Sequence, residues 1–198
     1  MSGWDADGCA HLSELERRCA GSWLKVDPAT VCGPPTGLLV GEMPGASSSS
    51  ALPLFPYPKN SAGGRLLSWS RITPGQYLGR LLRCNLFVTP RPDWDEILAH
   101  ELANDIMRAA TPELRIVLLG KRVAEAFEVY RVFEMQKRTR DDGQHYFICA
   151  IPHPSGRNLV YNEPVARVGA AAAIQWASDS IAPPTEKAQE RAEKGKRR

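Results

Sequence analysis

Short apolar runs separated by helical segments constrain the fold of this chain more than any other feature. Gly37-Leu-Leu-Val-Gly41 is wholly apolar and bounded by glycine, and Leu114-Arg-Ile-Val-Leu-Leu119 is nearly so. A strand of a parallel sheet is covered on both faces and reads as such a continuous apolar run. Strands that alternate with helices indicate an α/β fold, so we expect a three-layer α/β/α sandwich around a mostly parallel sheet.

Helix and turn signals fill the intervals between these runs. Ser13 and Glu16 resemble a capping box, which predicts an amphipathic helix over residues 10–24. Thr73-Pro74 is typical of a helix start, and Asp141-Asp-Gly143 predicts a turn between two neighbouring strands. The further strands are expected at 83–88, 131–138 and 144–151. The further helices are expected as two short ones within 65–82, one over 93–109 with Asp93 as N-cap and Ile97 in its apolar stripe, and others over 121–128 and 164–180.

Length and charge suggest one domain with a basic tail. With 198 residues, 43% of them hydrophobic, the chain can bury one core, so we expect a single domain over residues 1–182. Residues 185–198 hold six basic and three acidic side chains, a net +3 that equals the whole formal charge and leaves the rest neutral. Residues 183–198 are therefore expected to form a flexible basic tail, and any affinity for DNA must come from this tail and a local patch.

The sequence also indicates where the chain resides. No apolar run approaches the roughly 20 residues that span a bilayer, and the acidic N-terminus is unlike a signal peptide. We expect a soluble, cytoplasmic monomer with no membrane partner. The five cysteines are scattered and odd in number, which favours reduced thiols over a disulfide framework.

Two loops that leave predicted strands carry chemically capable residues. Gly41-Glu-Met-Pro-Gly45 follows the first strand, and His153-Pro-Ser-Gly-Arg-Asn158 follows the last. Ligands of open parallel sheets bind at the carboxyl ends of the strands. Both loops are therefore candidates for a binding or catalytic site.

These loops resemble the two motifs of the uracil-DNA glycosylase superfamily. The first is similar to the Gly-Glu-Ala-Pro-Gly of its iron–sulfur branch, and the second to the His-Pro-Ser-Pro-Arg-Asn of single-strand-selective glycosylases. Between them, Leu54-Phe55, Ser61-Ala-Gly-Gly-Arg-Leu-Leu67, Asn85-Leu-Phe87 and residues 116–127 resemble intervening family segments in the same order. The resemblance covers about residues 37 to 177 and implies an enzyme that cuts a pyrimidine from deoxyribose.

The resemblance assigns roles that the chemistry of the side chains supports. A neutral His153 can donate to the oxygen of the departing base, and Glu42 is the nearest carboxylate for water or sugar contacts. Asn85 offers a donor and an acceptor to the edge of a flipped base, with Phe55 as stacking face. Arg157 corresponds to the family's wedge residue. Met43 and Gly45 are expected beside the base, and Ser155, Asn158 and Arg65 are expected to contact DNA.

Each of these residues also has an ordinary structural interpretation. A loop histidine is often only solvated, and Glu42 can serve in a salt bridge or a cap. Asn85 can be a turn amide, Phe55 and its neighbour Tyr57 can anchor a loop, and Arg157 can be surface charge. Ser47-Ser-Ser-Ser50 is either a flexible linker or a set of hydroxyls that line the pocket.

The chain departs from the family pattern at its cysteines and in motif 1. Cys19 has no close partner and Thr89 stands where the third cluster ligand aligns, so we expect no iron–sulfur cluster. The spacing of Cys9, His11, Cys19 and Cys32 matches no common zinc site, so no metal and no cofactor are expected. Gly45 replaces the tyrosine that blocks pyrimidine C5 in strict uracil enzymes, and Met43 replaces their aspartate.

The sequence therefore predicts a monofunctional DNA glycosylase that excises uracil or a C5-modified pyrimidine, such as a hydroxymethylated or glucosylated base. Neither motif contains lysine, so no Schiff-base lyase step is expected. The role is base-excision repair or defence against phage with modified DNA, in the nucleoid of a bacterial cell or phage-infected host. The alternative is a non-catalytic DNA or modified-base binding module of the same fold. A nucleotide-binding α/β protein is disfavoured, because there is no glycine-rich phosphate loop.

Overall fold

The computed structural model describes residues 35–44 and 53–179. The helix expected over residues 10–24, the Ser47–Ser50 run and the basic tail lie outside these residues.

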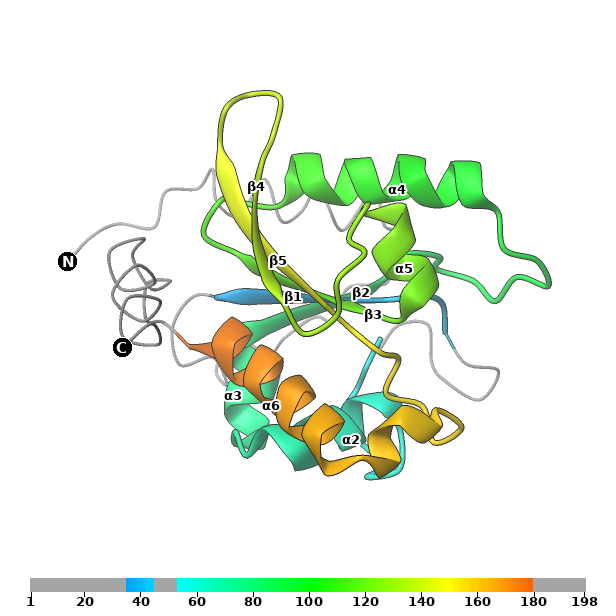
Figure 1. Ribbon diagram of the computed structural model, residues 1–198, viewed down its shortest axis with the longest axis vertical. Coiled ribbons are helices and arrows are strands. Elements are labelled where there is room, and N and C mark those ends of the chain that lie inside the picture. The colour runs from blue at the N-terminus through cyan, green and yellow to red at the C-terminus, as the bar shows by residue number, and fades with distance from the viewer. Residues whose placement is uncertain (1–34, 45–52, 180–198) are drawn as a thin grey trace, which may run out of the picture.

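A five-stranded, mostly parallel sheet forms the centre of the fold, in the order β2-β1-β3-β5-β4 (Figure 1). The strands are β1 (Gly37–Gly41), β2 (Leu81–Asn85), β3 (Arg115–Leu119), β4 (Met135–Thr139) and β5 (His145–Ile151). The pairs β1–β2, β1–β3 and β3–β5 are parallel, and only β4 pairs antiparallel, with β5. The expected α/β class and mostly parallel sheet are confirmed.

Helices cover both faces of the sheet (Figure 1). One face packs against α2 (Ala62–Ser70), α3 (Pro74–Arg80) and α6 (Pro164–Ser178). The other packs against α4 (Glu96–Ala109) and α5 (Lys121–Ala126). Thr73 caps α3 in a capping box with Gln76, as the Thr73-Pro74 signal predicts.

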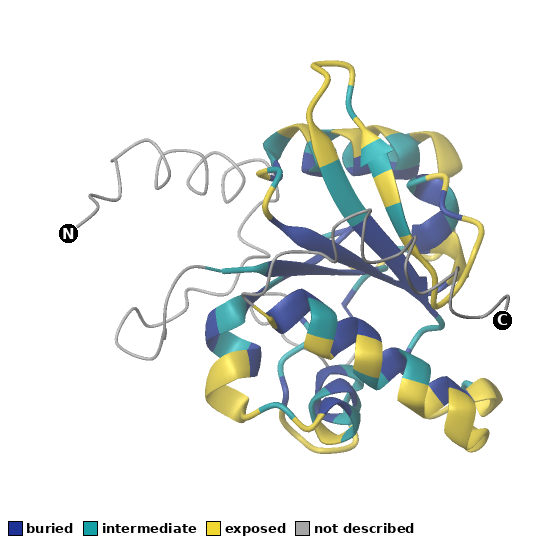
Figure 2. Cartoon of the chain, turned by 60° about the vertical axis from the view of Figure 1, so that its left-hand side comes forward, coloured by how far each residue is buried: buried dark blue, intermediate teal, exposed yellow. Residues whose placement is uncertain are grey.

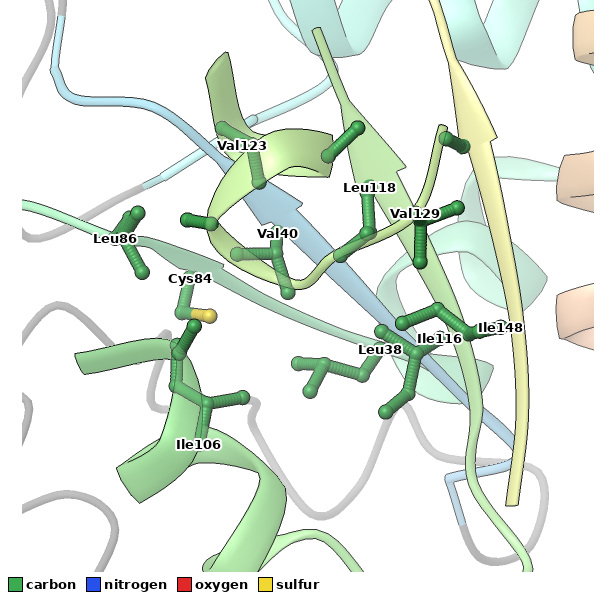
Figure 3. Packing of buried hydrophobic residues seen from close by; sticks show 14 of the residues in the cluster. Leu38, Val40, Cys84, Leu86, Ile106, Ile116, Leu118, Val123, Val129 and Ile148 are labelled. Atoms are coloured by element: carbon green, nitrogen blue, oxygen red, sulfur yellow. The ribbon is translucent and has the colours of Figure 1, made fainter. Parts of the chain in front are cut away.

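The apolar runs are buried because their side chains alternate between two cores. Leu38 and Val40 of β1 join the cluster under α4 and α5, shown in Figure 3, whereas Leu39 joins the cluster on the opposite face. The strands β1 and β3 are accordingly buried along their length, while the β4–β5 hairpin projects exposed residues (Figure 2). This two-sided burial explains why the strands read as continuous apolar runs.

Several predicted boundaries were wrong. The second strand covers 81–85 rather than 83–88, and Asp95, not Asp93, caps α4 by accepting from the Leu98 amide. Ile97 is 75% exposed, because the inner face of α4 is formed by Ala99, Ala103 and Ile106. Residues 131–134 precede β4 and make a single parallel bridge, between Val132 and Ala150.

One element was not expected. A 3-10 helix, η2 (Leu159–Asn162), follows the second motif, and the Asn158 side chain caps it by accepting from the Val160 amide. Among the residues that the structure describes, no helix is both long and apolar enough to cross a membrane.

Candidate functional site

Strand register brings the first three predicted residues to one edge of the sheet. Asn85 is the last residue of β2 and pairs with Gly41 of β1, so Glu42 lies directly after that pair. His153 follows β5 by two residues, beyond the pair of Leu119 with Ile151. Because these strands are parallel, their carboxyl ends share an edge, and the three chemically capable side chains follow one another along it, with Glu42 near enough to His153 to affect its pKa.

The side chain of Asn85 is buried over Gly41. Asn85 is 5% exposed, and a Cβ atom on Gly41 would lie 2.5 Å from its Oδ1 atom. The lack of a side chain at Gly41 therefore leaves the space that the amide fills. Among the described residues, the Asn85 side chain has no hydrogen-bond partner. In this part of the chain, the fully enclosed unpaired atoms are Arg83 Nε and Nη2 and Trp176 Nε1, so the Asn85 amide is not among them. Its donor and its acceptor are therefore open to solvent or to a ligand.

Burial favours the uncharged form of the His153 imidazole. Burial lowers the pKa of His153 below its usual value, and the nearby Glu42 carboxylate only partly opposes this effect. The loop backbone is held in place because the Asn158 side-chain amide donates to the His153 carbonyl at 3.0 Å. Gly120, at φ +108, lies so close that a Cβ there would be 3.3 Å from that of His153.

The Glu42 carboxylate is fixed by an ion pair. Arg122 Nη1, from the first turn of α5, lies 3.2 Å from Glu42 Oε1, which confirms the salt-bridge interpretation of this residue. The guanidinium of Arg122 in turn lies over the Trp94 ring, 5.6 Å from its centroid. The ion pair orients the carboxylate beside His153, and Arg122 is a site neighbour that the sequence motifs do not indicate.

Phe55 lies in a segment that is tightly held beside Asn85. Leu54 contacts the Asn85 region, since its Cδ2 would be 3.6 Å from a Cβ on Gly41. The Tyr77 hydroxyl donates to the Leu54 carbonyl at 3.1 Å, and a Cβ on Gly63 would come within 2.0 Å of the same oxygen. The Phe55 ring contacts Tyr57 at a centroid distance of 5.9 Å.

The second motif forms a loop that rests on Arg65. The guanidinium of Arg65 lies against Gly156, where a Cβ would be 2.5 Å from Nη2, and its Nε donates to the Asn60 carbonyl. Ser155 is half-buried, and its carbonyl accepts from the Asn158 amide at 3.2 Å. Arg157 is exposed. The loop thus contributes one exposed arginine, Arg157, and packs against a second, Arg65 of α2.

An aromatic pair supports the start of the same loop. The Tyr161 hydroxyl donates to the Pro152 carbonyl, one residue before His153. The Tyr161 ring packs on Trp69 of α2 at a centroid distance of 4.5 Å. Contacts from α2 and η2 therefore hold the loop at Pro152, where it begins, and at Gly156.

The remaining predicted residues are in the core or outside the described part of the chain. Met43 is half-buried and packs against the core under α4 and α5. Gly45 lies outside the described residues, as do Cys9, His11, Cys19 and Cys32. Cys84 and Cys149 are buried on opposite faces of the sheet. Within residues 35–44 and 53–179, no group of three or more His, Cys, Asp or Glu side chains is placed to hold a metal ion.

Comparison of the chain with protein-family models and with curated proteins finds no match.

Proposed function

We propose that this chain is a DNA glycosylase, a hydrolase of the bond between a base and its deoxyribose. More particularly, we propose a monofunctional enzyme of the uracil-DNA glycosylase type, with its three-layer α/β/α architecture, that flips out and excises a pyrimidine. One observation carries this proposal. Asn85 ends β2, and Glu42 and His153 follow β1 and β5, so all three lie at the carboxyl edge of the same mostly parallel sheet.

The chemistry requires three groups, and the site offers one candidate for each. The bond between C1′ and the base nitrogen breaks and leaves its electron pair on the base, while a water oxygen bonds to C1′ and releases a proton to solvent. An uncharged His153 donates to the base oxygen that gains negative charge. Glu42, held by Arg122, orients the water, and its charge offsets the positive charge that develops on the sugar.

Base recognition falls to Asn85. Its amide is buried and without a partner among the described residues, so a pyrimidine edge that pairs with it satisfies both groups at once. Phe55, one residue from the Leu54 contact, supplies a stacking face. Arg65, Ser155, Arg157 and Asn158 belong to the DNA-binding surface, and Met43 and Gly45 border the base.

The substrate is uracil or a pyrimidine modified at C5, and the setting is base-excision repair or defence against phage with modified DNA. Gly45 has no side chain to close off C5, which favours modified bases. The enzyme acts in the cytoplasm on nucleoid or phage DNA, as a monomer and without a cofactor. The second candidate is a binding module of the same fold, favoured by the Arg122 ion pair, which occupies one oxygen of the Glu42 carboxylate.

A panel of oligonucleotides tests the proposal. It contains uracil, 5-hydroxymethyluracil, and plain or glucosylated 5-hydroxymethylcytosine, each scored for alkali-sensitive strand breaks. The enzyme is expected to release at least one of these bases. Binding of a modified oligonucleotide without release of any base would instead support the binding module.

Substitution of His153 tests the mechanism on the substrate so identified. His153→Ala is expected to lower the chemical step by about 100-fold or more with DNA binding largely kept, because the lost donor acts in the transition state. His145→Ala, on an exposed residue of β5 that pairs with Thr139, is the matched control and keeps full activity. Equal activity of the two variants would remove His153 from the mechanism.

A further inference from the structure

A pocket includes His153 of the candidate site, but neither Asn85 nor Glu42 is among its lining residues. Its volume is about 400 Å³, and it is formed by the first turns of α5, the segment after α5, and the loop after β5. Its apolar wall consists of Val129, Tyr130, Val132 and Pro152, and its other end is formed by His153 and Asn158. The volume falls in the range of pockets that bind small organic groups.

The side chains at the mouth of this pocket are exposed although they are apolar. Tyr130 is 76% exposed and Val132 is 53% exposed. Lys121 stands at the rim, with its ammonium 3.6 Å from Glu125 in a largely solvated ion pair. An exposed aromatic ring and an apolar wall together suit the flat face of a nucleotide base, while Lys121 shares its charge with Glu125 of the same pocket.

Base flipping creates a need for such a surface. When one nucleotide leaves the stack, the base next to it loses a stacking partner. The strand must pass His153 if the glycosidic bond of the flipped nucleotide lies there, so a flanking nucleotide reaches the neighbouring pocket. Contact with an aromatic ring restores the lost stacking, whatever the identity of that base.

We infer that the pocket beside His153 binds the base of one nucleotide that flanks the excised one, stacked on Tyr130. This inference rests on the proposed glycosylase function and adds a substrate class to it. A base held in this pocket cannot pair with a complementary strand. The preferred substrate is therefore single-stranded DNA, or DNA with an unpaired base beside the target.

The decisive experiment removes the flanking base and the ring separately. Single-stranded 15-mers carry the target base found in the panel, with a tetrahydrofuran abasic analogue on its 5′ side, on its 3′ side, or on neither. For the wild type, the analogue on one side only is expected to lower kcat/KM about tenfold, within the range measured for base–aromatic stacking. Tyr130→Ala is expected to lose the same factor on the intact strand and nothing further on the abasic one.

Matched variants separate stacking from folding. Tyr130→Phe keeps the ring and is expected to keep wild-type behaviour, whereas Tyr57→Ala, which removes an exposed tyrosine outside this pocket, should leave the effect of the abasic analogue unchanged. The preference for single-stranded over duplex DNA should fall about tenfold in Tyr130→Ala. A 2-aminopurine at the sensitive flanking position should be quenched on binding to wild type and not to Tyr130→Ala.

The outcomes distinguish this inference from the proposed function. Base release that is insensitive to the abasic analogue on either side would overturn the flanking-base pocket and leave the glycosylase intact. A loss in Tyr130→Ala that is equally large on the abasic strand would mean that the pocket holds the target base itself. The absence of base release from every substrate of the panel would overturn the glycosylase, and the inference with it.

Discussion

The two outer strands of the sheet, β2 and β4, differ in how far their polar residues are buried. In β2 the residues Arg83 and Asn85 are almost fully buried, at 1% and 5% exposure. In β4, Met-Gln-Lys-Arg-Thr, the side chains alternate between exposed and half-buried. Both are edge strands, but β2 is covered by helices on its two faces, whereas β4 belongs to the projecting hairpin (Figure 2).

This difference shows on which strand a polar residue is evidence of function. On β4 a polar side chain is solvated, so its presence says little about function. On β2 it must be satisfied by the protein or by a ligand. Arg83 is partly satisfied, since its Nη1 donates to the carbonyls of Tyr77 and Leu81 at 2.8 and 2.7 Å. Its Nε and Nη2 are enclosed without a partner in the described part of the chain, so Arg83 belongs to the interior alone. Asn85 has no side-chain partner within the described residues either, but its amide is open to a ligand.

The comparison predicts its largest effect on stability at Arg83. Arg83→Ala is expected to lower the free energy of unfolding by about 3 kcal/mol, because it leaves a cavity and unpaired backbone carbonyls. Arg138→Ala on β4, which loses one exposed hydrogen bond to the Glu128 carbonyl, should cost less than about 1 kcal/mol. Urea unfolding of both variants gives the values, and equal losses would contradict the contrast between the strands.

Asn85 should show the reverse pattern, a large effect on activity and a small one on stability. Asn85→Ala is expected to lower kcat/KM about 100-fold, since a site built to pair with a polar edge discriminates strongly. Its free energy of unfolding should change by less than about 1 kcal/mol, because no hydrogen bond of the described fold is lost. Gln136→Ala on β4 is the control and should alter neither quantity.

Asn85→Asp sharpens the same assignment. A carboxylate accepts but does not donate, so relative rates across the base panel should change. Unchanged relative rates in this variant would remove Asn85 from base recognition.

Gly41 offers a more local change in β1, beside β2. An added Cβ at Gly41 would lie 2.5 Å from Asn85 Oδ1, while its next contacts are ordinary ones at 3.6 Å. Gly41→Ala should therefore displace the amide and lower activity about tenfold, with no further loss when it is combined with Asn85→Ala. Additive losses in the double variant would show that Gly41 acts through something other than the amide.

The smallest effect concerns pH. If the uncharged imidazole is the active form, kcat/KM should fall as pH decreases through the pKa of His153, which burial holds below its usual value. Glu42 raises that pKa, so Glu42→Gln should move the acid limb to lower pH, besides its effect on rate. Fits of kcat/KM against pH test the sign, and a shift to higher pH would contradict it. His145→Ala, at the exposed end of the β4–β5 hairpin, should leave the limb unchanged.

Local patterns predicted the strands and the shared edge of the site, but not the partners within it. The run from Gly37 to Gly41 indicated a buried strand, and parallel strands necessarily bring Glu42, Asn85 and His153 to one edge. Asp93 and Asp95 both precede α4, and only the turn geometry shows that Asp95 is the cap.

The Arg122 ion pair and the Tyr130 pocket depend on tertiary packing. Glu42 and Arg122 are far apart in the sequence, and their contact follows from the placement of α5 beside the end of β1. Tyr130 lies in the segment between α5 and β4, and its sequence context does not distinguish it from any other loop tyrosine.

The aromatic contacts on either side of the site give the protein its own optical probes. The Trp94 ring lies under the guanidinium of Arg122, which pairs with the Glu42 carboxylate. The Trp69 ring packs on Tyr161, whose hydroxyl donates to the Pro152 carbonyl, just before His153. Indole emission responds to nearby charge and packing, so a change at either end of the site alters the fluorescence of a different tryptophan. Variants that retain Trp94 or Trp69 as sole emitter would thus report changes at the Glu42 end and at the His153 loop separately, with no attached dye.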